Sequence, residues 1–175
     1  MIEQLFSIPV YRAQVSNFSA IQNEITNGIK NSKFSTNPGW GRTHYLSDPN
    51  FSENWLVKHR CDTLLSEISN HVDNYKKVLK IKTDCAVKES WVALFKEHNY
   101  GHIHSHADNI ISGVYYYKVK GSKGNLFFKS KRAWQNAAHA KSEEGLLLLF
   151  PSDLEHGITT NTSTVSRISI SFNLA

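Results

Sequence analysis

The residue pattern of this 175-residue chain changes near Thr83, and that change constrains the fold more than any other feature. Before it, apolar residues recur at helical spacing in residues 16–30 and 52–80. After it come short runs rich in β-branched and aromatic residues, separated by turn residues: ESWVALFKE, HIHSHAD, IISGVYYYKVK, NLFFKS, GLLLLFP, HGITT and VSRISISFN. Helices followed by many short strands predict a mainly β (α+β) fold, an antiparallel sandwich or barrel with helices packed on one sheet.

The chain length suits one domain, residues 1–175, in which residues 1–82 supply helical support and a loop and residues 83–175 the β-barrel core. A hydrophobic content of 40% is enough for a packed core, so we do not expect disorder. The segment FSTNPGWGRTHYLSDPN is rich in Pro, Gly and small polar residues, which predicts a long ordered loop. Its larger side chains are candidates for a substrate mouth: Trp40, Arg42, His44 and Tyr45.

Charge and cysteine content narrow the possible partners. The net charge of +5 is spread along the chain, which favours a solvated surface over a nucleic-acid groove, and no apolar stretch is long enough to span a bilayer. Two cysteines without CxxC spacing suit a reducing, cytoplasmic compartment. We therefore expect neither nucleic acid nor membrane as a partner, and the sequence leaves the oligomeric state open.

Four histidines fall within nine residues of the segment EHNYGHIHSHAD. Read as a strand, it places His104, His106 and Asp108 on one face. Such a face is costly to bury unless it binds something, and imidazole with carboxylate suits a divalent metal such as iron. His106 and Asp108 would supply two ligands, and His156, after the apolar run LLLLF, is the candidate for the third.

An arginine stands on the polar face of the last predicted strand. In VSRISISFN, Arg167 and Ser169 share a face with other hydroxyls, and the opposite face is apolar. If the apolar face packs under the helices, Arg167 points into the barrel and needs a carboxylate partner. A dicarboxylate cosubstrate that also chelates the metal would provide it, as in an iron and 2-oxoglutarate site, with Ser169 as a further donor. Alternatively, Arg167 forms a buried ion pair with Glu155 or Asp153.

Tyr115 and Tyr117 share a face of the strand that follows the histidines. Either hydroxyl could donate a hydrogen bond to 2-oxoglutarate. The alternative is that both are core aromatics of the barrel wall.

The motifs HIHSHADNIISGVYYYK, GLLLLFPSDLEHGI and RISISFN, with LFSIPVY near the start, resemble the 2-oxoglutarate and Fe(II)-dependent oxygenase superfamily. The similarity is greatest to a little-characterised bacterial and viral branch. It implies a double-stranded β-helix, or jelly roll, that uses Fe(II), 2-oxoglutarate and dioxygen and oxidises a C–H bond of a small-molecule or peptidyl substrate, usually by hydroxylation. For a viral member the compartment would be the host cytoplasm.

The resemblance leaves the metal ligands open between two sets. In the first, His106, Asp108 and His156 bind the ion, which we favour slightly because a carboxylate offsets its charge. In the second, His104 and His106 occupy the motif positions and the site has three histidines. Two other functions also remain: a cupin-like metal-binding jelly roll that does not use 2-oxoglutarate, and a non-catalytic β-sandwich with a structural zinc.

Overall fold

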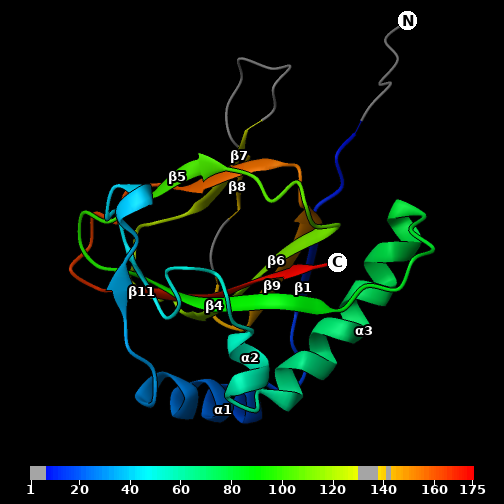
Figure 1. The fold of residues 1–175 in the computed structure, drawn as a ribbon, viewed down its shortest axis with the longest axis horizontal. Coiled ribbons are helices and arrows are strands. Elements are labelled where there is room, and N and C mark those ends of the chain that lie inside the picture. The colour runs from blue at the N-terminus through cyan, green and yellow to red at the C-terminus, as the bar shows by residue number, and fades with distance from the viewer. Residues whose placement is uncertain (1–6, 130–137, 141–142) are drawn as a thin grey trace, which may run out of the picture.

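The computed structural model describes residues 7–129, 138–140 and 143–175 and places most strands after the helices, as predicted (Figure 1). It departs from the predicted order in two places: one strand precedes the first helix, and the segment predicted as a loop contains two short strands and a 3₁₀ turn. The helices are α1 (Phe18–Lys30), α2 (Trp55–Lys58), α3 (Asp62–Leu79) and the short 3₁₀ helix η1 (Pro38–Trp40). The strands are β1 (Tyr11–Gln14), β2 (Ser35–Thr36), β3 (Tyr45–Leu46), β4 (Val87–Phe95), β5 (Gly101–His104), β6 (Ile111–Lys118), β7 (Leu126–Lys129), β8 (Ala138–Ala140), β9 (Leu146–Pro151), β10 (Glu155–Ile158) and β11 (Arg167–Leu174).

Two antiparallel sheets face each other. The larger has the order β1-β9-β6-β11-β4-β3-β2 and the smaller the order β5-β10-β7-β8. The three α-helices cover the outer face of the larger sheet, and the smaller sheet lies over its inner face (Figure 1). This arrangement confirms the predicted mainly β fold with helices on one sheet.

The predicted helix over residues 52–80 is two helices in the structure. Arg60 has a φ of 56° and Cys61 N–H donates to the carbonyl of Leu56, so the chain turns between α2 and α3. The apolar stripe predicted from the spacing is nevertheless the buried one, with Leu64, Ile68 and Val72 at most 2% exposed. These side chains pack with Ile170 and Phe172 of β11 in one core, which fixes the apolar face of β11 under the helices and turns its other face inward.

The helices pack closely enough that α1 requires a glycine. A Cβ at Gly28 would lie 2.6 Å from the ring of Trp55, which is buried and donates from Nε1 to Ser32 Oγ. We expect Gly28→Ala to destabilise the protein by about 1–2 kcal/mol in urea unfolding, because the overpacking outweighs the roughly 1 kcal/mol gained in helix propensity. Asn27→Ala, at the exposed neighbouring position, is the control and should be neutral or stabilising. A stabilising Gly28→Ala would contradict the close packing.

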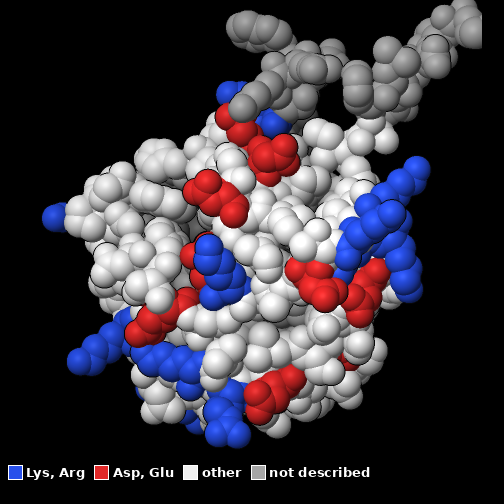
Figure 2. Space-filling model, turned by 45° about the vertical axis from the view of Figure 1, so that its right-hand side comes forward, with Lys and Arg blue, Asp and Glu red and all other residues white. Residues whose placement is uncertain are grey.

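The charged side chains on one face of the molecule do not gather in a single groove (Figure 2). On the face shown in Figure 2, lysines and arginines form several separate groups with acidic side chains between them. Among the described residues, no helix has the length and apolar character required to cross a membrane.

Candidate active site

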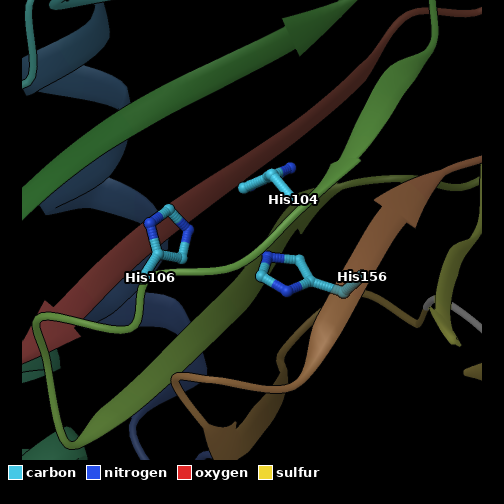
Figure 3. Close-up of side chains that lie close together, drawn as sticks. All are labelled: His104, His106 and His156. Carbon is cyan, nitrogen blue, oxygen red and sulfur yellow. The ribbon is translucent and has the colours of Figure 1, made fainter. Parts of the chain in front are cut away.

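Three histidines converge between the two sheets (Figure 3). His104 ends β5 and His156 stands opposite it in β10, while His106 follows β5 in the connection to β6. One nitrogen of each ring lies within 4.8 Å of the others, and the ring centroids of His104 and His156 are 4.4 Å apart. The chain can hold His106 in place because its N–H donates to the carbonyl of Ser152, at 2.7 Å.

The hydrogen bonds of two of these rings fix which nitrogen is available. Nδ1 of His104 contacts the carbonyl oxygen of His102 at 2.8 Å, and Nδ1 of His156 contacts that of Leu154 at 2.9 Å. Because a carbonyl can only accept, each Nδ1 carries the proton and each Nε2 keeps its lone pair. Hydrogen bonds from the other ring nitrogen to a backbone carbonyl are typical of metal-binding histidines.

Burial keeps the imidazoles neutral. It lowers the pKa of His156 to about 4 and that of His106 to about 3, with a further contribution from the neighbouring His104. The pKa of His104 is lowered as well, again mainly by burial. The buried His44, which stacks on Phe95 at 4.6 Å, has a pKa lowered to about 4, by burial first and by His104 and Arg167 next. Neutral imidazole is the form that coordinates a metal.

The metal-free protein should lose stability in mild acid. Below pH 6.5 the unfolded chain protonates histidines that the folded chain keeps neutral down to about pH 4, so the free energy of unfolding falls as the pH falls through this window. For His44 and His156 the loss at pH 5 is up to about 2 kcal/mol each. Urea unfolding at pH 7 and pH 5 measures it, and His44→Gln should make the dependence shallower. Equal stability at both pH values would contradict this prediction.

Asp108 does not join the histidines. The strand β5 ends at His104 and residues 105–110 form a turn, so the alternation that we expected to run through Asp108 stops four residues before it. His106 still returns to the site, whereas Asp108 is exposed in the turn. The structure thus brings together His104, His106 and His156 and leaves Asp108 outside that group.

Arg167 is fully buried at the start of β11, on the face predicted from its strand. Its Nη1 donates to Ser169 Oγ at 2.9 Å, while Nε and Nη2 have no acceptor among the described residues. No ion pair of Arg167 occurs in the described part of the chain, so neither alternative partner pairs with it: Asp153 is exposed and Glu155 is half-buried. The rings of Phe95 and Tyr116 flank the guanidinium, whose carbon lies 5.3 Å and 5.1 Å from their centroids. A buried cation in this state requires an anionic ligand.

Tyr115 and Tyr117 lie on the other side of the sheet. The Tyr115 ring belongs to the core under the helices, with its hydroxyl 3.5 Å from Gln22, and the Tyr117 hydroxyl is 2.8 Å from that of Thr26. Their predicted role at 2-oxoglutarate is therefore wrong. Both are core aromatics, which was the alternative prediction. Tyr116 is the tyrosine that faces Arg167. Residues on both faces of β6 are buried, so the sequence does not show whether its odd-numbered or its even-numbered residues face the cavity.

The histidines and Arg167 line one cavity between the sheets. Trp40 and His44 of the predicted mouth also line it, whereas the exposed Arg42 and the half-buried Tyr45 do not belong to the lining. Sequence reasoning missed further members of the lining, which only the pairing of β4, β6 and β11 brings to the same face: Trp91, Phe95, Ser112 and Asn173.

A family model described as "Putative 2OG-Fe(II) oxygenase" matches residues 89–173, which run from β4 into β11 and include the histidines and Arg167. This match supports the 2-oxoglutarate and Fe(II)-dependent oxygenase superfamily as the family of the chain. The enzyme is accordingly a 2-oxoglutarate-dependent dioxygenase that uses Fe(II), 2-oxoglutarate and dioxygen. No curated protein matches its sequence significantly.

Solved structures share the fold of this oxygenase at low sequence identity. An oxidoreductase of the 2OG-Fe(II) oxygenase family from Burkholderia pseudomallei has a TM-score of 0.71 at 8% identity, over 94% of this chain and 84% of that one. A prolyl-4-hydroxylase from Pseudomonas putida has a TM-score of 0.67 at 14% identity, over 95% and 92%. HygX from Streptomyces hygroscopicus, solved with nickel and 2-oxoglutarate, has a TM-score of 0.68 at 8% identity, over 96% and 83%. The two facing sheets are the jelly roll of these proteins.

Proposed function

We propose that the enzyme is a hydroxylase in which His104, His106 and His156 bind Fe(II) and Arg167, with Ser169, binds the distal carboxylate of 2-oxoglutarate. One observation carries the proposal: a fully buried guanidinium, two of whose donor nitrogens have no acceptor among the described residues, lines the same cavity as three convergent neutral imidazoles. A dicarboxylate that reaches both groups satisfies the cation and completes the coordination of the ion.

In the overall reaction one atom of dioxygen enters succinate and the other enters the product, so that 2-oxoglutarate, O₂ and R–H give succinate, CO₂ and R–OH. Bound iron with 2-oxoglutarate would supply the activation of dioxygen and the oxidation of the C–H bond. The protein's own part is binding and orientation. Arg167 holds one end of the cosubstrate, and Phe95 and Tyr116 keep water from the guanidinium.

The residue set fits this chemistry better than the alternatives. A metal-binding jelly roll without 2-oxoglutarate has no need of Arg167, and a structural zinc site is normally closed by a fourth protein ligand. Only three convergent ligands occur among the described residues, which leaves coordination positions open for substrates. Three histidines also suit a non-haem ion whose remaining ligands come from an anionic cosubstrate.

The substrate class and compartment are also proposals. Structural relatives include prolyl hydroxylases, one of them solved with a peptide fragment of hypoxia inducible factor, and an epimerase of nogalamycin biosynthesis. We propose a small-molecule or peptidyl substrate for this enzyme. The two free cysteines, of which Cys61 is buried, support a reducing cytoplasmic compartment.

The decisive experiment is an anaerobic titration of the metal-free protein with Fe(II) and then 2-oxoglutarate, followed through the visible metal-to-ligand charge-transfer band. We expect a saturable band in the wild type and its loss or weakening in His156→Ala and Arg167→Ala. Binding of Fe(II) without a band would favour the jelly roll that does not use 2-oxoglutarate. Binding of zinc alone, without turnover of 2-oxoglutarate, would favour the structural site.

A further inference from the structure

The cavity continues past the histidines, away from Arg167. Alternate residues of β11 face it, and Arg167, Ser169, Ser171 and Asn173 each form a row with the residue opposite on β4. The ring of His106 lies 5.8 Å from Trp91, which pairs with Ser171. Along the strands, Arg167 therefore lies two rows from Trp91 in one direction, and Asn173 lies one row from Trp91 in the other direction. Neighbouring rows are about 7 Å apart. A cosubstrate held at the Arg167 end would leave the Asn173 end to a second substrate.

Buried polar side chains line the Asn173 end of the cavity, and a chain of hydrogen bonds connects them to the carboxylate of Glu89. Ser112 Oγ donates to Asn173 Oδ1 at 2.7 Å, and Asn173 Nδ2 donates to Glu89 Oε1 at 2.7 Å. Ser112 and Asn173 are 2% and 1% exposed and line the cavity, while Glu89, opposite Asn173 on β4, is half-buried and lies just beyond the lining. The relay fixes the orientation of Glu89 and engages one of its two oxygens.

Aromatic faces lie between this carboxylate and the histidines. The rings of Trp40 and Phe51 are 5.2 Å apart, and Phe51 meets Trp91 edge-on at 4.8 Å. Trp40 also lies 4.7 Å from His104, so the wall reaches the three histidines. Trp40 and Trp91 belong to the cavity lining. Indole faces attract cations, and most strongly where water is excluded.

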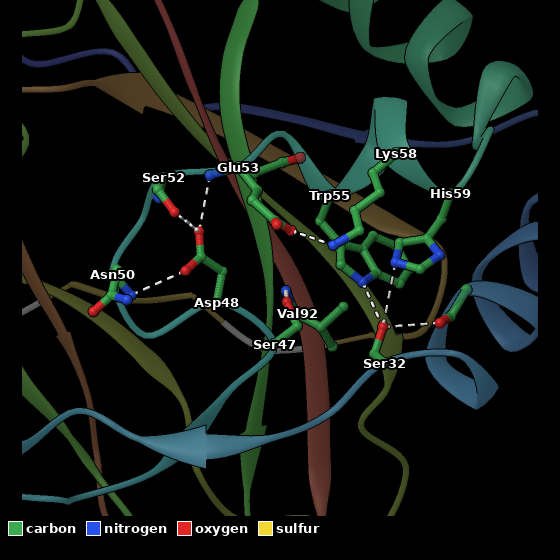
Figure 4. A network of polar contacts seen from close by, with 12 residues as sticks. Ser32, Ser47, Asp48, Asn50, Ser52, Glu53, Trp55, Lys58, His59 and Val92 are labelled. Carbon is green, nitrogen blue, oxygen red and sulfur yellow. Dashed lines mark hydrogen bonds and ion pairs between the residues drawn. The ribbon is translucent and has the colours of Figure 1, made fainter.

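The loop that carries Phe51 is held firmly in place (Figure 4). Asp48 accepts the backbone N–H groups of Asn50, Ser52 and Glu53, at 2.6 to 3.0 Å. Burial opposes ionisation of this carboxyl, but the hydrogen bonds outweigh it and hold its pKa below the usual value. The N–H of Ser90, next to Glu89, donates to the carbonyl of Glu53. This bond joins the loop directly to the part of β4 that carries Glu89.

The turns that border this end add negative charge. Asp108 is exposed in the turn that follows His106, and Asp153 is exposed in the turn between β9 and β10. The first turn is fixed to β11 by the N–H of Ile110, which donates to the carbonyl of Leu174, one residue beyond Asn173. Negative charge at the mouth of a cavity raises the local concentration of cations.

We propose that Glu89 is a specificity-determining residue that binds a cationic nitrogen group of the primary substrate, an ammonium or guanidinium, with Asn173 as its positioning residue. The inference rests on the proposed function, because the Arg167 end is assigned there to 2-oxoglutarate. The substrate's charged nitrogen lies at Glu89, its alkyl chain packs along Trp91, and a carbon of that chain is presented to the metal centre. The carboxylate and the aromatic faces both favour a cation over a neutral group of the same shape.

The test uses N-acetyl-lysinamide and N-acetyl-argininamide as cationic probes, with N-acetyl-norleucinamide and N-acetyl-glutaminamide as neutral counterparts. Binding is measured by calorimetry to the full chain loaded with Mn(II) and 2-oxoglutarate under anaerobic conditions. We expect at least one cationic probe to bind the wild type about tenfold or more tightly than either neutral probe, and Glu89→Gln to remove that preference. Glu97→Gln, exposed just beyond the opposite end of β4, should retain it.

Two results would overturn the proposal: equal or no binding of all four probes to the wild type, or a cationic preference that survives in Glu89→Gln. Glutamine can still accept from Asn173, so this variant preserves the relay and its fold can be checked through the Fe(II) and 2-oxoglutarate charge-transfer band. A band without cationic preference contradicts the role of Glu89 alone. Absence of the band in the wild type contradicts the proposed function instead.

Discussion

Arg167→Met is expected to abolish 2-oxoglutarate binding and, at the same time, to make the metal-free protein more stable. Nε and Nη2, for which the described part of the chain offers no acceptor, are the donor nitrogens available to a carboxylate. Loss of two charge-assisted hydrogen bonds, each worth about 1.5–3 kcal/mol, should raise the dissociation constant for 2-oxoglutarate by about 100-fold or more.

The gain in stability follows from the same burial. Arg167 is fully buried, and desolvation lowers its pKa even though the neighbouring Tyr116 acts in the opposite direction. A methionine of similar length would remove the buried charge and keep the packing against Phe95 and Tyr116. Replacing buried charges by apolar side chains is often neutral or stabilising by about 1–4 kcal/mol, and we expect a change in this range.

Urea unfolding of the metal-free protein and calorimetric titration with 2-oxoglutarate in the presence of Mn(II) measure both effects. Arg60→Met is the matched control: its side chain is 86% exposed, and it should change neither quantity appreciably. A metal-free Arg167→Met protein destabilised by several kcal/mol would mean that Arg167 is a structural residue. Unchanged 2-oxoglutarate affinity would exclude Arg167 from the cosubstrate site.

The sequence predicted the inward direction of Arg167 because β11 has one apolar face and one polar face. Ile168, Ile170 and Phe172 could only face the helices, so the alternation left a single direction for Arg167. The tyrosines of β6 illustrate the opposite case. That strand is buried on both faces and a bulge at Ile168/Ser169 shifts its register against β11, so alternation alone could not say whether Tyr115 or Tyr116 faces the cavity.

The subsite at Glu89 was not predictable from local pattern. Glu89, Ser112 and Asn173 stand on three different strands and meet only through the pairing of β4 and β6 with β11. Each residue taken singly is an ordinary polar residue near a strand end. Likewise, the break between α2 and α3 depends on the backbone at Arg60, which adopts a left-handed conformation without the glycine that would have signalled it.

His104→Ala is expected to weaken Fe(II) binding by about 100-fold or more, whereas Asp108→Ala should change it less than about twofold. A carboxylate would offset more of the ion's charge, which favoured Asp108 on chemical grounds alone. The structure places Asp108 away from the histidines, because β5 ends at His104 and the following turn leaves Asp108 exposed to water. His104 instead stands opposite His156 with its Nδ1 at a carbonyl, and its free Nε2 is available to the ion.

Anaerobic equilibrium titration with Fe(II), monitored by competition with a chromophoric chelator, compares the two variants with the wild type and with His106→Ala and His156→Ala. The three histidine variants should lose the ion to a similar extent, because each removes one of three ligands from one centre. His102→Ala is the local control, since that exposed residue contributes only its backbone carbonyl to His104 and the carbonyl persists in the variant. Loss of Fe(II) in Asp108→Ala with retention in His104→Ala would restore the two-histidine, one-carboxylate set, and would require residues 105–110 to rearrange when the metal binds.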